Sequence, residues 1–311
     1  TFLKFESYKQ KLKLAAIEIG SNAIRFQISR VIDYGNKITV KKLEYVRFPL
    51  RLGQDVFNKN KITKRSRKKF LKLMKAFKLL LDLYEVDHHM ICATSAMREA
   101  KNGRAIANKI KDKLDLEITI INGDEEAWLI NNVILDSLNE DHTVHIDVGG
   151  GSTEINVYNG KKKIDSESFK IGSVRNLQGK DNPDVWIHME EWVKKNVKGL
   201  ENLHAIGTGG NINKIYELGK TKRDNSISIK NFQTVLDEIE AMSLETRMTQ
   251  LMMNPDRADV IVPASKIYLS VMKWAKASKI IIPQVGLKDG MMSLMIQKHF
   301  KKWQREHVLV K

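Results

Sequence analysis

The chain has 311 residues, of which 42% are hydrophobic and 29% charged, a composition typical of a globular protein with room for two domains. Lys and Arg number 53 against 37 Asp and Glu, so the formal net charge is +16. This excess favours a polyanionic partner, such as nucleic acid, a membrane surface or a phosphate polymer, although a solvated Lys-rich surface also explains it.

Several classes of protein are excluded or disfavoured by simple patterns. No apolar run reaches the about 20 residues that a membrane span needs, and the single cysteine, Cys92, cannot form an intrachain disulfide. The first seven residues lack the apolar core of a signal peptide. We therefore expect a cytoplasmic protein that does not enter a membrane.

Apolar periodicity and turn residues predict the elements of the first half. A buried strand over 13–19 leads into a Gly-Ser-Asn turn, and strands over 23–33 and 37–47 continue it as a meander. Thr63 is expected to cap a long helix whose apolar side chains recur every three or four residues. The remaining elements are a strand over 90–94, a helix over 103–113, a strand over 117–122 and a helix over about 124–138.

The same strand-turn-strand pattern restarts at residue 143. Strands are expected over 143–148, 153–158 and 163–170, then helices over 183–198, 211–219, 230–241 and 258–278, with short strands over 203–206 and 279–282. The polar segment 139–142 is the best linker candidate. We therefore predict two related domains, 1–139 and 140–311, with a C-terminal helix over about 290–304 that could join either one.

The segment His145–Glu154 carries the most information about chemistry. An apolar strand ends at Asp147, and three glycines, Ser152, Thr153 and Glu154 follow. Successive glycines let backbone N–H groups approach a ligand closely, and hydroxyls add donors. Asp147 and Glu154 bracket the turn with hard oxygens suited to a divalent cation. The pattern indicates a site for phosphate and metal, and the alternative is a tight glycine-rich hairpin.

A weaker version of this pattern stands near the N-terminus. Glu18 ends a strand, and Gly20, Ser21 and Asn22 form the turn after it. Asn22 can donate an amide hydrogen bond to phosphate. Two such turns suggest two half-domains that face each other across a phosphate.

Three further segments carry candidate site residues. Arg98 follows the strand over 90–94, where its planar guanidinium suits phosphate oxygens, although a surface ion pair is the simpler interpretation. Glu126 begins a helix, where an acid is favoured by the helix dipole or could position a water molecule as a weak base. Gly209 belongs to a third glycine turn, which serves either phosphate contact or close packing.

A basic run extends from Lys59 to Lys72, with eight Lys or Arg and no acid. It is either a solvated helix face or an electrostatic track for a long polyanion. The histidines beside the strands lack the ligand spacing of a zinc site.

Taken together, the segments resemble one known family. Their order and spacing are similar to those of the exopolyphosphatase/guanosine pentaphosphate phosphatase (Ppx/GppA) family, in its short two-domain form. The matching segments are Ala16–Asn22, Ala93–Ala100, Ile121–Ala127, Ile146–Glu154, Gly207–Asn211 and Gly286–Gly290. The resemblance implies an α/β fold with two actin-like ATPase (ribonuclease H-like) domains flanking a cleft, and frequent homodimers.

The resemblance also implies roles for individual residues. Glu126 matches the glutamate that activates water, and Asp147 and Glu154 match residues associated with the metal, Mg²⁺ or another divalent cation, and the water. Phosphate-binding roles fall on Ser21, Asn22, Arg98, Gly149, Gly150, Gly151, Ser152 and Gly209. Glu18 departs from the family pattern, which usually has Asp there, and its longer side chain puts direct metal coordination by Glu18 in doubt.

The expected function is therefore a Mg²⁺-dependent exopolyphosphatase, with the basic excess favouring polyphosphate as the substrate. The alternatives are a guanosine pentaphosphate phosphohydrolase, an ATP-using kinase or ATPase of the same superfamily, and a weakly catalytic polyphosphate or nucleotide sensor. A nucleic-acid partner is not expected.

Overall fold

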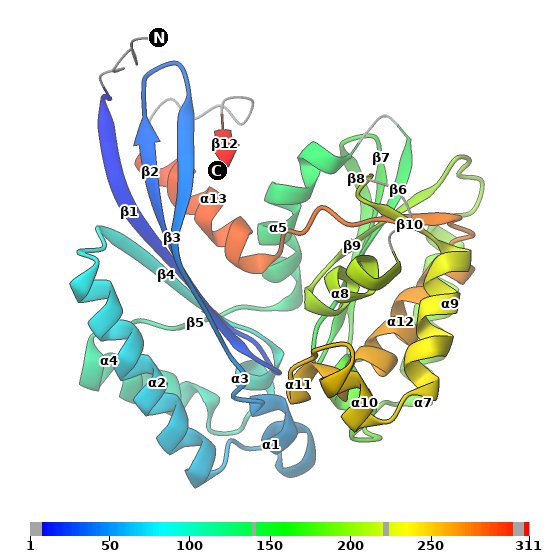
Figure 1. The fold of residues 1–311 in the computed structure, drawn as a ribbon, viewed down its shortest axis with the longest axis horizontal. Helices are drawn as coiled ribbons and strands as arrows, with labels where there is room; N and C mark the ends of the chain where they lie inside the picture. The colour runs from blue at the N-terminus through cyan, green and yellow to red at the C-terminus, as the bar shows by residue number, and fades with distance from the viewer. Residues whose placement is uncertain (1–7, 139–140, 220–223, 301–307, 311) are drawn as a thin grey trace.

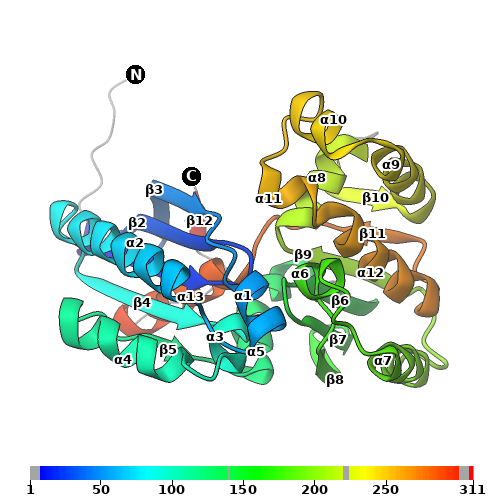
Figure 2. The ribbon, with the colours of Figure 1, turned by 90° about the horizontal axis from the view of Figure 1, so that it is seen from below.

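The computed structural model describes residues 8–138, 141–219, 224–300 and 308–310, which fold into two lobes (Figure 1). Each lobe is built on a six-stranded mixed sheet with helices packed against it, as the view from below shows (Figure 2). This arrangement confirms the expected α/β fold with two similar domains.

The first sheet has the strand order β12-β3-β2-β1-β4-β5. Its strands are β1 (Gln10–Ile19), β2 (Ile24–Asp33), β3 (Ile38–Phe48), β4 (His88–Ala93), β5 (Thr119–Ile120) and β12 (Val308–Val310). The helices between them are α1 (Leu52–Lys59), α2 (Lys64–Leu83), α3 (Ser95–Glu99), α4 (Gly103–Leu114) and α5 (Gly123–Ile134), which ends in a 3₁₀ turn (Leu135–Ser137).

The second sheet has the strand order β10-β11-β9-β6-β7-β8. Its strands are β6 (His142–Val148), β7 (Thr153–Asn159), β8 (Lys162–Phe169), β9 (His204–Thr208), β10 (Ser226–Ser228) and β11 (Lys279–Ile281). The helices from here on are α6 (Ser173–Leu177), α7 (Pro183–Asn196), α8 (Gly210–Gly219), α9 (Ile229–Ala241), α10 (Leu244–Thr249), α11 (Pro255–Ala258), α12 (Ile261–Trp274) and α13 (Leu287–His299).

Corresponding strands of the two sheets pair in the same way. β1 runs antiparallel to β2 and parallel to β4, and β6 runs antiparallel to β7 and parallel to β9. In each lobe the glycine turn therefore closes the first hairpin, at the edge where the parallel strands also end. Ligand sites of α/β sheets lie at such carboxyl ends.

Helix α2 illustrates why the sequence pattern succeeded. Thr63 accepts a hydrogen bond from the Ser66 N–H at 3.3 Å, so it caps the helix as predicted. The apolar positions at helical spacing lie against the first sheet, and Phe77 stacks on Phe26 with ring centroids 4.7 Å apart. Burying one such aromatic contributes about 1.5–3 kcal/mol.

Helix α13 returns the chain to the first lobe. It packs against α5 and β1, and Gly290 allows that approach because a Cβ there would lie 2.1 Å from the Leu129 carbonyl oxygen. The helix begins at Leu287, three residues earlier than predicted, and positions 301–304 of the expected helix lie outside the described residues. The division at residue 139 stays a prediction, since residues 139–140 are also outside them.

Short helices account for most of the remaining differences. The expected helix over 258–278 is found as the shorter α12, which the separate short helix α11 precedes, and α1, α3, α6 and α10 were not predicted. Helices of four to eight residues span too few turns to show a periodic pattern. In the described part of the chain, no helix combines the length and hydropathy that crossing a membrane requires.

Candidate active site

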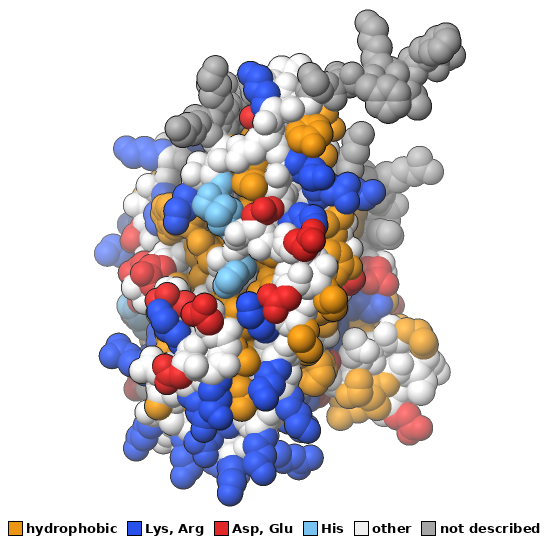
Figure 3. Space-filling view, turned by 90° about the vertical axis from the view of Figure 1, so that its left-hand side faces the viewer, with side chains coloured by type: hydrophobic (Ala, Val, Ile, Leu, Met, Phe, Trp, Pro, Cys, Tyr) orange, Lys and Arg blue, Asp and Glu red, His pale blue; other side chains and the backbone are white. Residues whose placement is uncertain are grey.

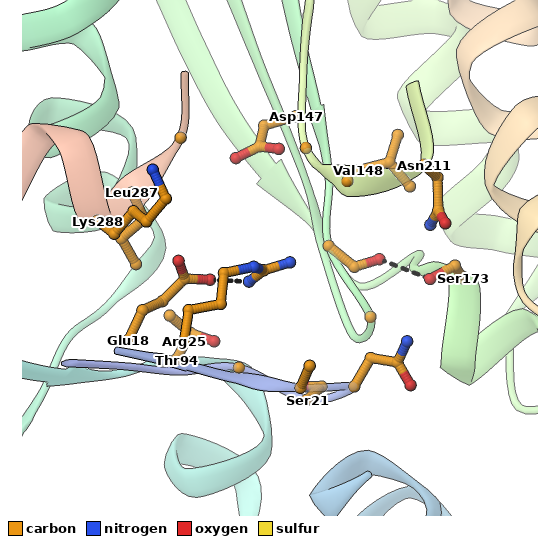
Figure 4. A pocket seen from close by; sticks show the side chains of 18 of the residues that line it. Glu18, Ser21, Arg25, Thr94, Asp147, Val148, Ser173, Asn211, Leu287 and Lys288 are labelled. Atoms are coloured by element: carbon orange, nitrogen blue, oxygen red, sulfur yellow. Dashed lines mark hydrogen bonds and ion pairs between the residues drawn. The ribbon is translucent and has the colours of Figure 1, made fainter. Parts of the chain in front are cut away.

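A polar cavity of about 210 Å³ lies between the lobes, where the three glycine turns and the start of α13 converge (Figure 4). Gly20, Glu126 and Gly150 all line it, although they come from distant parts of the chain. The cavity therefore brings together a residue of each predicted hairpin turn and the candidate catalytic glutamate.

The turn at Gly149–Ser152 has its carbonyl groups engaged on the α6 side. The Gly149 oxygen accepts from the Ser173 N–H at 3.0 Å, and the Gly150 oxygen accepts from the N–H groups at the start of α6. Arg175 Nε donates to the Gly151 oxygen at 2.8 Å. Within the described residues, the N–H groups of Gly150 and Gly151 donate to no protein acceptor. They remain available as donors to an anion.

The same glycines also let the two lobes touch. A Cβ on Gly150 would lie 2.9 Å from Ser21 Cβ, and one on Gly151 would lie 2.5 Å from the Phe57 ring. Arg175 adds a clamp across this contact, because its Nη2 donates to both carboxylate oxygens of Glu99 at 2.7 Å. Interlobe packing is thus a second reason for glycine here, which the sequence did not reveal.

Three carboxyl groups interact electrostatically beside the cavity: Glu126 and the half-buried Asp147 line it, and the buried Glu154 lies behind its wall. Burial, and then the charge of Glu154, raises the pKa of Asp147 to about 7. Burial also raises the pKa of Glu154, although hydrogen bonds from Ser152 and Ser168 oppose the shift. The Ser168 hydroxyl donates to Glu154 Oε1 at 2.9 Å. These groups repel one another, so a cation among them is favourable.

Glu126 differs from the sequence expectation of a weakly basic, helix-stabilised carboxylate. Burial, and then the charges of Glu154 and Asp147, raises its pKa well above the usual range. Its side chain is 12% exposed, and its Oε2 has no hydrogen-bond partner in the described structure. A buried carboxylate oxygen that accepts no hydrogen bond, in a group whose pKa is raised, is a strong proton acceptor.

The local sequence explains why Glu126 points inward. Asn122 and Glu125 form a capping box, with the Glu125 N–H donating to Asn122 Oδ1 at 2.8 Å, which fixes the start of α5. Glu126, Ile130 and Ile134 then follow at a spacing of four on the buried face. Glu125 serves the helix end, and Glu126 faces the cavity.

The donor set fits Mg²⁺. This ion is usually held by one or two carboxylates together with substrate phosphates and water. No group of three or more His, Cys, Asp or Glu in the described ranges is arranged to hold a metal by itself. Asp147 and Glu154 supply two hard oxygen donors. Burial raises the pKa of both, although Arg25 opposes the shift at Asp147 and Arg98 opposes it at Glu154.

Glu18 lines the cavity but is committed to an ion pair. In the register of β1 and β2 it lies directly opposite Arg25, and the two side chains form a short hydrogen-bonded pair. Arg47 lies opposite Arg25 on β3 and pairs with Asp256 of α11. The four groups form a row that runs from the first lobe to the second, with two adjacent arginines flanked by a carboxylate at each end.

Ser21 and Asn22 are both held in place. Ser21 Oγ lies 2.7 Å from Ser95 Oγ and accepts from the Ala96 N–H at 3.1 Å. Asn22 donates to the backbone oxygen of Asp256 at 2.8 Å, so its amide bridges the lobes in this structure. Both residues line the cavity.

Arg98 lies behind the cavity wall. Its Nη1 donates to the Ile121 oxygen at 2.7 Å and stands 4.0 Å from Glu126 Oε2. Gly209 has φ +112°, and a Cβ there would lie 3.2 Å from Asp147 Oδ1, so only glycine suits this turn. Arg98 thus contacts the Glu126 environment, and Gly209 leaves room for Asp147.

Sequence analysis missed several residues that line the cavity. They are Tyr45, Arg47, Ser95, Ser173, Asn213, Arg257 and Gln284. Arg47 could have been found from strand register, because it follows Glu18 and Arg25 across the meander. Lys288, in the late glycine motif, also lines the cavity, and Figure 4 shows it on the same side as Asp147.

Comparisons with known proteins agree with this architecture. The model of the Ppx/GppA phosphatase family matches residues 31–299. The chain is 29% identical to a bifunctional 3-dehydroquinate synthase/phosphatase of Fusobacterium nucleatum, over 94% of this chain and 47% of that protein. It is 24% identical to a guanosine-5'-triphosphate,3'-diphosphate pyrophosphatase of Photobacterium profundum, over 91% of this chain and 59% of that protein.

A solved structure shares the fold. An exopolyphosphatase of Cytophaga hutchinsonii superposes with a TM-score of 0.77 at 22% identity, over 93% of this chain and 98% of that one. The chain therefore belongs to the Ppx/GppA phosphatase family, because the family match covers most of its length. It spans about half the length of the two curated relatives.

Proposed function

We propose that the protein is a Mg²⁺-dependent exopolyphosphatase that releases orthophosphate from the end of linear polyphosphate. The observation that carries this proposal is the buried Oε2 of Glu126, which accepts no hydrogen bond within the described structure, beside a cavity framed by the Gly20 and Gly150 turns. A strong base and free backbone donors on opposite sides of one small space suit attack of water on a phosphoryl group.

In this mechanism Glu126 accepts a proton from a water molecule while the oxygen of that water attacks the terminal phosphorus. The bond from that phosphorus to the bridging oxygen breaks, and the shortened chain leaves with the electron pair. The free N–H groups of the Gly149–Ser152 turn hold the terminal phosphoryl oxygens. Ser21 lies beside the same turn, where its hydroxyl adds a phosphate contact.

Asp147 and Glu154 would hold the metal, Mg²⁺, which would neutralise charge on the substrate phosphates when bound. Glu18 is the weaker candidate ligand, because its carboxylate is engaged by Arg25. Asn22 and Arg98 remain proposed phosphate contacts that must exchange their present partners to reach the substrate.

Cavity size and charge favour polyphosphate. The cavity of about 210 Å³ is smaller than the about 300–1,000 Å³ typical of drug-sized ligands, which suits a narrow chain end better than a nucleoside. Arg25, Arg47, Arg257 and Lys288 all line it. The net charge of +16 further favours a long polyanion.

Guanosine pentaphosphate is the second candidate substrate. The name of the Photobacterium relative points to it. Tyr45 lines the cavity and is 39% exposed, so a base could stack on its ring if it displaced Lys42 or Lys288, whose Nζ atoms lie 5.7 and 5.8 Å from the ring centroid. A weakly catalytic sensor is a third candidate, favoured by the Glu18–Arg25 pair.

The deciding assay measures phosphate release from polyphosphate, guanosine pentaphosphate and ATP, each with and without Mg²⁺. The proposal requires Mg²⁺-dependent release with the highest kcat/KM on polyphosphate. A strong preference for guanosine pentaphosphate would replace it with the second candidate, and tight polyphosphate binding without release would favour the sensor. We also propose a cytoplasmic homodimer, which sedimentation of the purified protein tests for oligomeric state.

A further inference from the structure

One face of the first lobe carries a dense set of cations away from the cavity. Figure 3 shows Lys and Arg side chains gathered at the lower end of this lobe, over the end of α1 and the start of α2. We call this set the basic face. It consists of Lys59, Lys61, Lys64, Arg65, Arg67, Lys68, Lys69, Lys72 and Lys75, all exposed.

The basic face is not neutralised by the protein itself. Residues 59–75 contain no Asp or Glu, and none of the nine cations forms an ion pair within the described structure. Further along α2 the pattern changes, because Lys78 pairs with Asp82 at 2.9 Å. The unpaired charge is therefore confined to one end of the helix.

Several of these cations lie at the helix N-terminus, where the helix dipole favours negative charge. The first turn of α2 contains no acid, yet it carries Lys64, Arg65 and Arg67. Each positive charge near a helix N-terminus is unfavourable by about 0.3–1 kcal/mol. An anion bound here interacts favourably both with the side chains and with the helix dipole. A surface that only needed solubility would place acids in this turn.

We propose that the basic face binds the distal part of a long polyphosphate chain whose end lies in the cavity, an inference that rests on the proposed function. The face reaches the cavity through α1. The Gly53 N–H near the start of α1 donates to the Ser21 oxygen at 2.8 Å, and Lys59 ends the helix. Eight residues of helix span about 12 Å, so Lys59, at the near edge of the face, lies about that far along α1 from the Ser21 turn, which lines the cavity.

Other polyanions fit this surface less well. Single-stranded nucleic acid is bound by cations interleaved with exposed aromatic rings, but Phe70, the aromatic residue of the segment, is fully buried. A membrane-surface helix exposes an apolar face, but the apolar side chains Phe70, Met74 and Phe77 are packed in the core. A flexible chain of phosphates needs only the charge.

Binding at two places on one chain raises the effective concentration of the chain end at the cavity. The basic face therefore lowers the KM for long chains without changing kcat. It has no effect on a substrate too short to leave the cavity. This length dependence separates the proposal from a general electrostatic attraction.

The test uses the variant K64Q/R65Q/K68Q/K69Q, since Gln keeps the helix propensity and removes four charges. We expect the KM for polyphosphate of several hundred units to rise about tenfold with kcat unchanged. The slope of log kcat/KM against log salt should become shallower by about 3, at 0.7–0.9 for each lost phosphate contact. Hydrolysis of tripolyphosphate should not change.

The matched control is K170Q/K195Q/K198Q/K230Q, which removes four exposed lysines of the second lobe. An equal rise in KM for the control, or an equal loss on tripolyphosphate, overturns the proposal. Direct binding of labelled long polyphosphate is measured in parallel. If the wild type releases no phosphate, the proposed function fails, and loss of binding in the α2 variant alone still decides the role of the basic face. Equally tight binding of a single-stranded oligonucleotide of matched charge contradicts the choice of polyphosphate.

Discussion

Replacing Glu126 by Gln removes the proposed base while keeping the shape of the side chain. Positioned general bases contribute about 10²–10⁴ in rate, which corresponds to about 3–5 kcal/mol of barrier. The effect should fall at the upper end of that range, because Glu126 is buried, accepts no hydrogen bond at Oε2 and has a raised pKa. We expect E126Q to lower kcat by about 10³–10⁴ with little change in substrate affinity.

The assay is phosphate release from polyphosphate under saturating Mg²⁺, with binding of the substrate measured separately. E125Q is the matched control, since Glu125 is adjacent, has the same side chain and accepts from the Asn122 N–H at 2.7 Å. Its amide oxygen can keep that hydrogen bond, so its rate should stay within about threefold of wild type.

E126Q also allows a separate test, which measures the stability of the fold. A raised pKa means that the ionised Glu126 destabilises the fold at pH 8, so E126Q should be more stable than wild type there. Turnover at the parental rate refutes the assignment of Glu126 as the base. A variant that loses activity and also unfolds at lower temperature would show that the residue is structural.

Three further predictions concern the surroundings of Glu126. Tyr268 is fully buried, donates to the Thr208 oxygen and accepts from the Val148 N–H, so it fixes the turns beside Asp147. Y268F should therefore lower kcat about tenfold and leave KM unchanged. A rise in KM alone contradicts a positioning role for Tyr268. Burial raises the pKa of Asp147 to about 7, so the folded protein holds a proton that the unfolded chain releases above about pH 4. Without metal, the free energy of unfolding should therefore fall between pH 4 and 7, by at most about 1.4 kcal/mol per unit, and then level off. The stability of D147N, measured by thermal unfolding, should lack this pH dependence. Equal slopes of stability against pH for D147N and wild type contradict the raised pKa of Asp147. R175K cannot contact Glu99 and the Gly151 oxygen at the same time, as Nη2 and Nε of Arg175 do. It should lower the unfolding temperature by a few degrees, and an unchanged unfolding curve disproves this expectation.

The parts of the fold that the sequence predicted are those with local signals. Strand alternation, the glycine turns and the Thr63 cap lie within a few residues of one another, so the meander, α2 and the second hairpin were found. The sequence predicted that Gly149–Gly151 contact phosphate, and the structure shows that Gly150 and Gly151 also pack against Ser21 and Phe57. That contact joins segments about a hundred residues apart, which no local pattern reports.

Long-range partners also explain what was missed at the site. The interlobe contacts of Asn22 and Arg47 both depend on Asp256, far along the chain. The weak basicity expected for Glu126 considered only the dipole of its own helix. In the structure, burial and the neighbouring carboxylates of the second lobe outweigh that dipole.

The most direct measurement follows the oxygen of the attacking water. Polyphosphate hydrolysis in water enriched in ¹⁸O should place one labelled oxygen in each released orthophosphate and none in the shortened chain, and E126Q should slow this incorporation as much as phosphate release. Label in the remaining chain, or unlabelled orthophosphate, contradicts attack of water on the terminal phosphorus in this cavity.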